Sequence, residues 1–190
     1  FFIENRSNIT YRDISPNLIN ALVAIEDIRF EKHSGIDEKA LLRVFYGVIT
    51  GNQKGGGSTL TQQLAKNLFP RGRLSKPQLV LRKFQEWITA LKLERYYSKE
   101  EIIAMYLNTV PFGHNSYGIK SAAATFFDSS PDSLNIQEAA LMAGVVNAPT
   151  RYSPISNPER SLQRRNLVLQ QMLKYNFITQ DVYDSVSLLP

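Results

Sequence analysis

The chain has 190 residues, of which 43% are hydrophobic and 21% are charged, and this composition predicts one ordinary globular domain. It has no cysteine, which excludes disulfides, thiolate catalysis and cysteine-ligated zinc. The net charge of +5 is typical either of a solvated basic surface or of a protein with an anionic partner.

The hydrophobic pattern is overwhelmingly helical, and no internal repeat or strong strand signal accompanies it. Residues 1–15 are expected to be extended. Capping residues mark several helix starts, among them Asp37, Ser98 and Asn135. We therefore expect an all-α or nearly all-α fold. The expected helices span about 16–30, 37–49, 59–69, 78–97, 98–108, 118–127, 139–146, 159–175 and 180–187.

Two of these helices carry apolar stripes that we expect to be buried. The stripe of the second helix consists of Ala40, Leu41, Val44, Phe45, Val48 and Ile49. The stripe of the long helix 78–97 consists of Val80, Phe84, Trp87, Ile88 and Leu91. On its opposite side Arg82 and Glu86 are four residues apart, as in a surface salt bridge worth about 0.3–0.5 kcal/mol. The alternative is that Arg82 binds phosphate oxygens.

Glu26 lies in the middle of the apolar arc of the first helix, between Leu22 and Val23 on a helical wheel. A carboxylate in that position is either a buried, paired structural group or a group that lines a cleft cut into the core. The second arrangement is typical of a general acid or base.

A glycine-rich loop, Gly51–Gly57, leads directly into the third helix. Free N–H groups at a helix start suit a phosphate, although a plain surface loop is the alternative. The loop is no Walker motif, because Gly57 stands where that motif has lysine. One face of the helix carries amides, a hydroxyl and one lysine, which suits sugar and phosphate contacts. Its members are Thr59, Gln62, Gln63 and Lys66.

A second loop, residues 69–77, combines apolar side chains with cations and contains two prolines and a glycine. Such a loop can dip into a lipid interface while its cations meet anionic headgroups, and a solvent-exposed loop is the alternative. The side chains concerned are Phe69, Leu74, Arg71, Arg73 and Lys76.

Five segments of the chain resemble the signatures of the family-51 glycosyltransferases, the peptidoglycan polymerases. The first has the family's Glu-Asp followed by Phe, His, Gly and Asp at matching spacings, and the second matches nearly letter for letter. The resemblance covers about residues 13–180, with a departure at His114-Asn115-Ser116, where glycine and alanine are more usual. The five segments are Glu26–Asp37, Gly57–Asn67, Arg82–Glu86, Glu100–Asn108 and Arg164–Met172.

The resemblance implies a mainly α, lysozyme-like fold with a large helical lobe and a smaller membrane-proximal lobe, formed by residues 1–190. It implies two substrates, lipid II and a growing lipid-linked glycan strand, and a location at the extracytoplasmic face of the bacterial cytoplasmic membrane. The membrane anchor is expected outside this chain, which starts like a cut within a longer protein. In this family the domain occurs alone or joined to a C-terminal transpeptidase domain, and both remain open.

The resemblance also implies roles for individual residues. Glu26 is expected to be the catalytic base. Glu86 is expected to be a second catalytic carboxylate that supports a cation or a divalent metal (Mg²⁺ or Mn²⁺), or that orients the acceptor. No cofactor is required by the sequence itself. The expected substrate-binding residues are Asp27, Ser58, Thr59, Gln62, Gln63, Lys66, Arg82 and Lys83, whereas His33 is expected to be structural.

Two other classes of function remain as alternatives. A lysozyme-like hydrolase that cleaves glycan strands could use one buried glutamate, but a neutral glycan needs no phosphate-binding cations at positions 66 and 82. A catalytically silent glycan-binding domain has no reason to place Glu26 in an apolar arc. Nucleic acid is not expected as a partner, because the basic residues form no continuous stripe.

Overall fold

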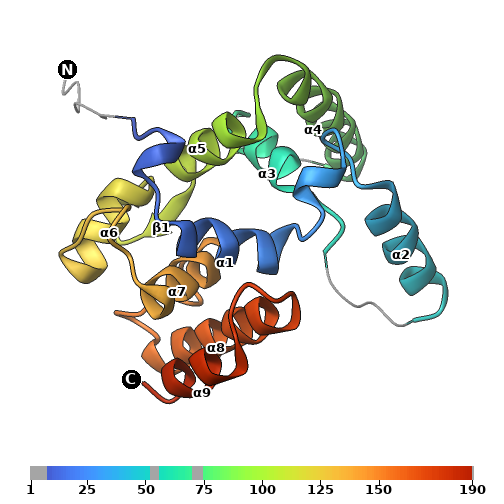
Figure 1. Cartoon of the computed structure of the whole chain (residues 1–190). Helices are drawn as coiled ribbons and strands as arrows, with labels where there is room; N and C mark the ends of the chain where they lie inside the picture. Colours follow the sequence, from blue (N-terminus) through green and yellow to red (C-terminus); the bar gives the residue numbers. More distant parts are fainter. Residues whose placement is uncertain (1–7, 52–55, 70–74, 190) are drawn as a thin grey trace.

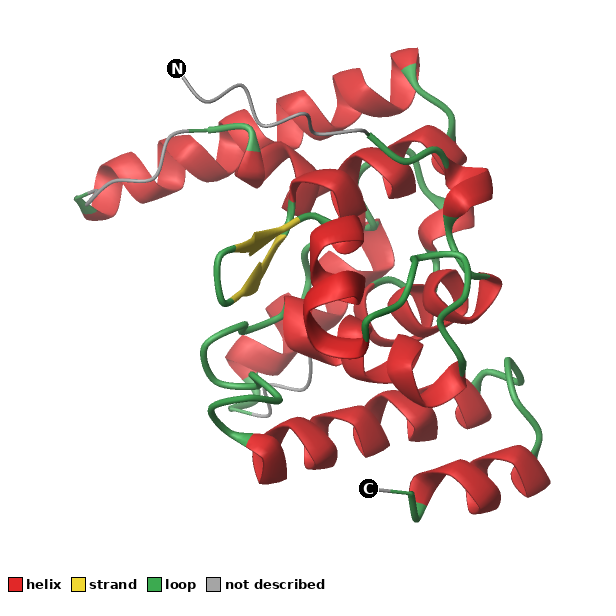
Figure 2. Ribbon diagram, turned by 90° about the vertical axis from the view of Figure 1, so that its left-hand side faces the viewer, coloured by secondary structure: helices red, strands yellow, loops and turns green. Residues whose placement is uncertain are grey.

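The computed structural model describes residues 8–51, 56–69 and 75–189, and helices dominate this part of the chain (Figures 1 and 2). Two short 3-10 helices, η1 (Tyr11–Asp13) and η2 (Phe30–Lys32), and one hairpin of strands β1 (Pro111–Gly113) and β2 (Ser116–Tyr117) complete it. The mainly α fold is therefore confirmed. The helices are α1 (Pro16–Glu26), α2 (Glu38–Ile49), α3 (Leu60–Asn67), α4 (Lys76–Tyr96), α5 (Lys99–Thr109), α6 (Ile119–Phe127), α7 (Ile136–Val146), α8 (Pro158–Lys174) and α9 (Gln180–Ser187).

The hydrophobic core lies among six helices. Helix α7 packs against both α1 and α8, and α3 packs against α4 and α5 (Figure 1). The contributing helices are α1, α3, α5, α6, α7 and α8, and their largest fully buried side chains include Leu18, Leu22, Leu64, Tyr106, Ile119 and Met142.

Most helix starts follow the expected capping residues. The Asp37 side chain accepts a hydrogen bond from the amide of Ala40, and Ser98 and Asn135 each form a capping box. Two boundaries differ from the expectation. Helix α1 ends at Glu26 rather than near residue 30, and a short hairpin occupies the expected loop at 110–117.

The expected orientation of α4 is wrong. Val80, Phe84 and Ile88, from the stripe that we expected to be buried, are 59%, 53% and 55% exposed. The opposite face, with Glu86 at 6% and Ala90 at 0%, is buried instead. Helical periodicity shows which residues share a face, but the rest of the chain decides which face it covers. Here α3 covers the polar face.

The apolar stripe of α2 is also less buried than expected. Ala40 is buried, Leu41 and Val44 are half-buried, and the other three side chains of the stripe lie outside the described residues. Residues 52–55 of the glycine loop and 70–74 of the second loop lie outside them as well. Within the described ranges no helix is both long and apolar enough to cross a bilayer. The division into a large and a small lobe stays a prediction.

Candidate active site

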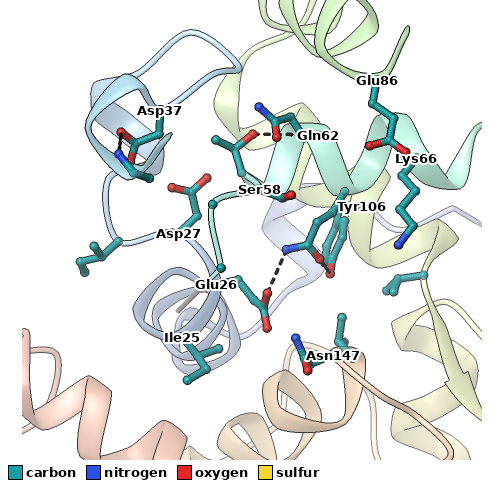
Figure 3. A pocket seen from close by; sticks show the side chains of 18 of the residues that line it. Ile25, Glu26, Asp27, Asp37, Ser58, Gln62, Lys66, Glu86, Tyr106 and Asn147 are labelled. Carbon is teal, nitrogen blue, oxygen red and sulfur yellow. Dashed lines mark hydrogen bonds between the residues drawn. The ribbon is translucent and has the colours of Figure 1, made fainter. Parts of the chain in front are cut away.

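One cleft of about 1370 Å³ contains every residue that the sequence singled out for catalysis or substrate binding. Its walls come from α1, α3, α4 and α8 and from the chain that precedes α3. Figure 3 shows the Glu26 carboxylate pointing into this space and Lys66 reaching into it from α3. The ten predicted residues at its lining are Glu26, Asp27, Ser58, Thr59, Gln62, Gln63, Lys66, Arg82, Lys83 and Glu86.

Glu26 is the last residue of α1, and a relay of hydrogen bonds holds its side chain. The Gln63 side-chain amide donates to Glu26 Oε2 at 2.9 Å, and the Tyr106 hydroxyl donates to Gln63 Oε1 at 3.0 Å. Burial, followed by the negative charge of Glu26, raises the pKa of Tyr106 well above its ordinary value, so the phenol stays protonated and can donate. Gln63 therefore positions the carboxylate.

Arg164 is a member of the site to which the sequence analysis gave no role. Its Nη2 atom lies 3.6 Å from Glu26 Oε1, and its guanidinium lies over the Tyr152 ring, 5.4 Å from the centroid. It belongs to the fifth resembling segment, but nothing in the local pattern of α8 indicates that it meets the end of α1. The cleft wall near Glu26 also includes Asn147, at the end of α7.

Asp27 is buried, and its carboxylate is already engaged. His33 Nε2 lies 2.9 Å from Oδ2, and the backbone amide of Leu60 donates to the same oxygen at 3.0 Å. The amide of Gly35 donates to His33 Nδ1, which leaves the proton on Nε2 and directs it to Asp27. Asp27 thus supplies the anion at the start of α3, where a phosphate was one expectation, and His33 is structural as expected.

Thr59 and Gln62 are also committed to the protein itself. The Thr59 hydroxyl donates to the carbonyl of Gly35 at 2.7 Å, and the Gln62 side-chain amide approaches the same oxygen at 3.3 Å. Gly35 itself is packed so closely that a Cβ there would lie 2.9 Å from the backbone of Ala90. These contacts fix α3 and α4 around the segment between α1 and α2. Substrate contacts by Thr59 and Gln62 stay a prediction that this geometry does not favour.

The three cations predicted to bind the substrate line the cleft together with Glu86. Lys66 is exposed, whereas the guanidinium of Arg82 lies 4.9 Å from the Phe69 ring centroid. The Lys83 ammonium donates to Ser58 Oγ and to Glu86 Oε2, both at 3.0 Å. The Glu86 carboxylate is therefore paired with the ammonium of Lys83, the residue that follows Arg82.

A divalent metal at Glu86 stays a prediction. The carboxylate is paired with Lys83, and no group of three or more acidic, histidine or cysteine side chains comes together within residues 8–51, 56–69 and 75–189. Mg²⁺ beside a pyrophosphate is usually held by one or two carboxylates together with the substrate's phosphate oxygens, so Glu86 would be its protein ligand here.

A mainly helical fold around a cleft with one hydrogen-bonded carboxylate and several cations is the arrangement expected of a glycosyltransferase. The transglycosylase family model matches residues 2–173, and the chain belongs to this family. The match confirms the expected family and the expected class of enzyme, a glycosyltransferase.

Relatives of known name agree with this assignment. Penicillin-binding protein 1A of Aquifex aeolicus is 42% identical over 183 residues, which are 96% of this chain and 25% of the relative. Penicillin-binding protein 1A of Escherichia coli is 36% identical over 95% of this chain and 21% of its own length. The crystal structure of penicillin-binding protein 1A from Haemophilus influenzae shares the fold, with a TM-score of 0.57 and 24% identity over 96% of this chain and 17% of that chain. The chain thus spans about a quarter of these curated relatives.

Substituting Asp27 by Asn separates its positioning role from a role in substrate binding. The amide keeps the size of the side chain but loses the charge that His33 and Leu60 meet. We expect the free energy of unfolding to fall by about 2–3 kcal/mol, because the partners of a buried charged group lose their match. Urea denaturation measures this loss, with the exposed Glu31→Gln as control. Unchanged stability together with weaker substrate binding would instead identify Asp27 as a substrate ligand.

Proposed function

We propose that this domain polymerises lipid II into glycan strands and releases polyprenyl pyrophosphate. The observation that carries the proposal is the placement of a carboxylate held by Gln63 in the same cleft as three cations. A carboxylate suits removal of a proton from a sugar hydroxyl, and cations suit a leaving pyrophosphate. The transglycosylase family match supports the same reaction.

In this reaction Glu26 takes the proton of the 4-hydroxyl group of the acceptor sugar. The oxygen then attacks the anomeric carbon of the donor strand, and the bond from that carbon to the phosphate oxygen breaks with inversion. The bonding electrons leave with the pyrophosphate, on which negative charge develops. Lys66, Arg82 and Lys83 are the groups that stabilise this charge, and Glu86 keeps the Lys83 ammonium in place.

Replacing Glu26 by Gln tests the proposed base. The amide keeps the shape of the side chain but cannot accept the proton, so polymerisation should fall about 100- to 10,000-fold. The measurement is the rate at which labelled lipid II enters polymer, with circular dichroism to verify the fold. Near-normal turnover by the folded variant would contradict the assignment. Glycan cleavage without release of polyprenyl pyrophosphate by the unaltered chain would identify the hydrolase instead.

Replacing Lys66 or Arg82 by Ala tests the pyrophosphate contact. Each loss should lower donor use by about 10- to 100-fold, since a charge-assisted hydrogen bond contributes about 1.5–3 kcal/mol. The free energy of unfolding should change little, and Lys39→Ala, on the exposed side of α2, is the matched control. Equal losses with a donor that lacks pyrophosphate would show that these cations have another role.

We further propose that the exposed apolar face of α4 rests on the anionic membrane that carries the substrate. The face consists of Val80, Leu81, Phe84, Ile88 and Leu91, each about half exposed or more. Large apolar patches of this kind are rarely left in contact with water. Arg82 and Lys83 lie on the same helix and line the cleft. The helix would therefore place the pyrophosphate-binding cations at the level of the lipid headgroups.

Polar substitution on this face tests the membrane contact. The triple variant Val80→Ser, Phe84→Ser, Ile88→Ser should bind vesicles that contain anionic lipid at least about tenfold more weakly, because each buried side chain contributes about 1.5–3 kcal/mol. It should use full-length lipid II more slowly and a short-chain, water-soluble analogue at nearly the normal rate. The control is Ile155→Ser, an exposed apolar residue outside α4. Equal vesicle binding by the triple variant and the control would rule this contact out.

A further inference from the structure

The two carboxylate oxygens of Glu26 have different surroundings. Oε2 accepts a hydrogen bond from Gln63, whereas Oε1 is buried and has no hydrogen-bond partner among the described residues. The nearest cation is Arg164, whose Nη2 lies 3.6 Å from Oε1. Both side chains are largely removed from solvent, with 7% of Glu26 and 14% of Arg164 exposed. The pair is therefore much less screened than a surface ion pair.

The hydrogen bonds from Tyr106 to Gln63 and from Gln63 to Glu26 fix the orientation of the Gln63 amide. Because the Tyr106 phenol donates to Gln63 Oε1, the amide nitrogen of Gln63 has to face Glu26. A reversed Gln63 amide would turn its Oε1 toward the carboxylate, which cannot donate, so the hydrogen bond to Glu26 would be lost. Glu26 Oε2 is thus held by Gln63, whereas Oε1 has the charge of Arg164 beside it. A separation of 3.6 Å lets Arg164 attract Oε1 electrostatically without forming a direct hydrogen bond to it.

The position of Arg164 is itself determined by packing. Gly144 of α7 lies under its side chain, and a Cβ added there would lie 2.9 Å from Arg164 Cγ. The Tyr152 ring flanks the guanidinium, and Arg164 Nε is buried without a hydrogen-bond partner among the described residues. The glycine and the ring therefore fix the guanidinium beside the carboxylate by packing.

We propose that Arg164 is a positioning residue for Glu26, one that fixes the orientation of the carboxylate for the acceptor hydroxyl. The inference rests on the proposed transglycosylation. Gln63 holds Oε2 of Glu26 by a hydrogen bond, and Arg164 attracts Oε1 by its charge. A residue with this role acts on the chemical step. A substrate-binding arginine acts mainly on KM, and a structural ion pair acts mainly on stability.

The test measures kcat and KM for polymerisation of labelled lipid II by the 190-residue chain and its variants. Arg164→Ala should lower kcat about 10- to 100-fold and change KM less than about threefold, since it removes orientation of the base rather than a substrate contact. Arg164→Lys should recover part of kcat by restoring the charge. Added guanidinium ion should raise kcat of Arg164→Ala but not that of Glu26→Gln. Arg160→Ala, one turn away on the exposed side of α8, should behave as the unaltered chain.

A second variant changes the position of Arg164 without changing its charge. Gly144→Ala places a methyl group where the Arg164 stem lies, so kcat should fall about 3- to 30-fold, while alanine itself favours the helix by about 1 kcal/mol. This variant also decides the matter if Arg164→Ala does not fold, which thermal unfolding would reveal.

The possible failures are distinguishable. No polymer from the unaltered chain would refute the proposed function itself. Polymer from the unaltered chain, with kcat of the Arg164 and Gly144 variants within about twofold of normal, would overturn only the positioning role. A loss confined to KM would overturn it too, and would make Arg164 a substrate ligand.

Discussion

The structure depends on the buried carboxylate of Asp27. It connects the end of α1, the His33 segment and the first amide of α3, and the contacts of Thr59 with Gly35 and of Gln63 with Glu26 join the same three parts. A buried charge is costly unless hydrogen bonds satisfy it, and here a histidine and a helix start do so. Because Asp27 follows Glu26 directly, the same contacts place the proposed base beside Gln63 of α3. The catalytic geometry therefore follows from a structural contact one residue away.

This arrangement explains why the two neighbouring acids have different roles. Asp27 accepts hydrogen bonds from His33 and from the amide of Leu60, whereas Glu26 lines the cleft and accepts one from Gln63. Thr59 and Gln62 show the same division on α3, since both serve the carbonyl of Gly35 while Gln63, the next residue, faces the cleft. Within each of these two segments, some residues thus hold the fold together while a neighbouring residue faces the cleft.

The sequence predicted much of this fold because its helix starts are chemically local. Asp37, Ser98 and Asn135 cap the helices that follow them, and each cap needs only residues within one turn. All ten residues predicted for the site line one cleft, because α3 packs against α4 and contacts the end of α1. The ion pair of Glu26 with Arg164 could not be predicted in this way. It joins the end of α1 to the middle of α8, and these helices meet only when α1, α7 and α8 pack against one another.

The orientation of α4 was the other feature beyond local reading, and its reversal links the site to its substrate. An amphipathic helix normally turns its apolar face to the core, but the segment before α3 offers α4 a polar contact in which Ser58, Lys83 and Glu86 are joined. Once those groups face the cleft, the apolar residues on the far side must face outward. Water is a poor partner for that surface, whereas a bilayer is a favourable one. On this interpretation one helix answers two demands of a lipid-linked substrate, a charged surface for its pyrophosphate and an apolar surface for the membrane that holds its tail.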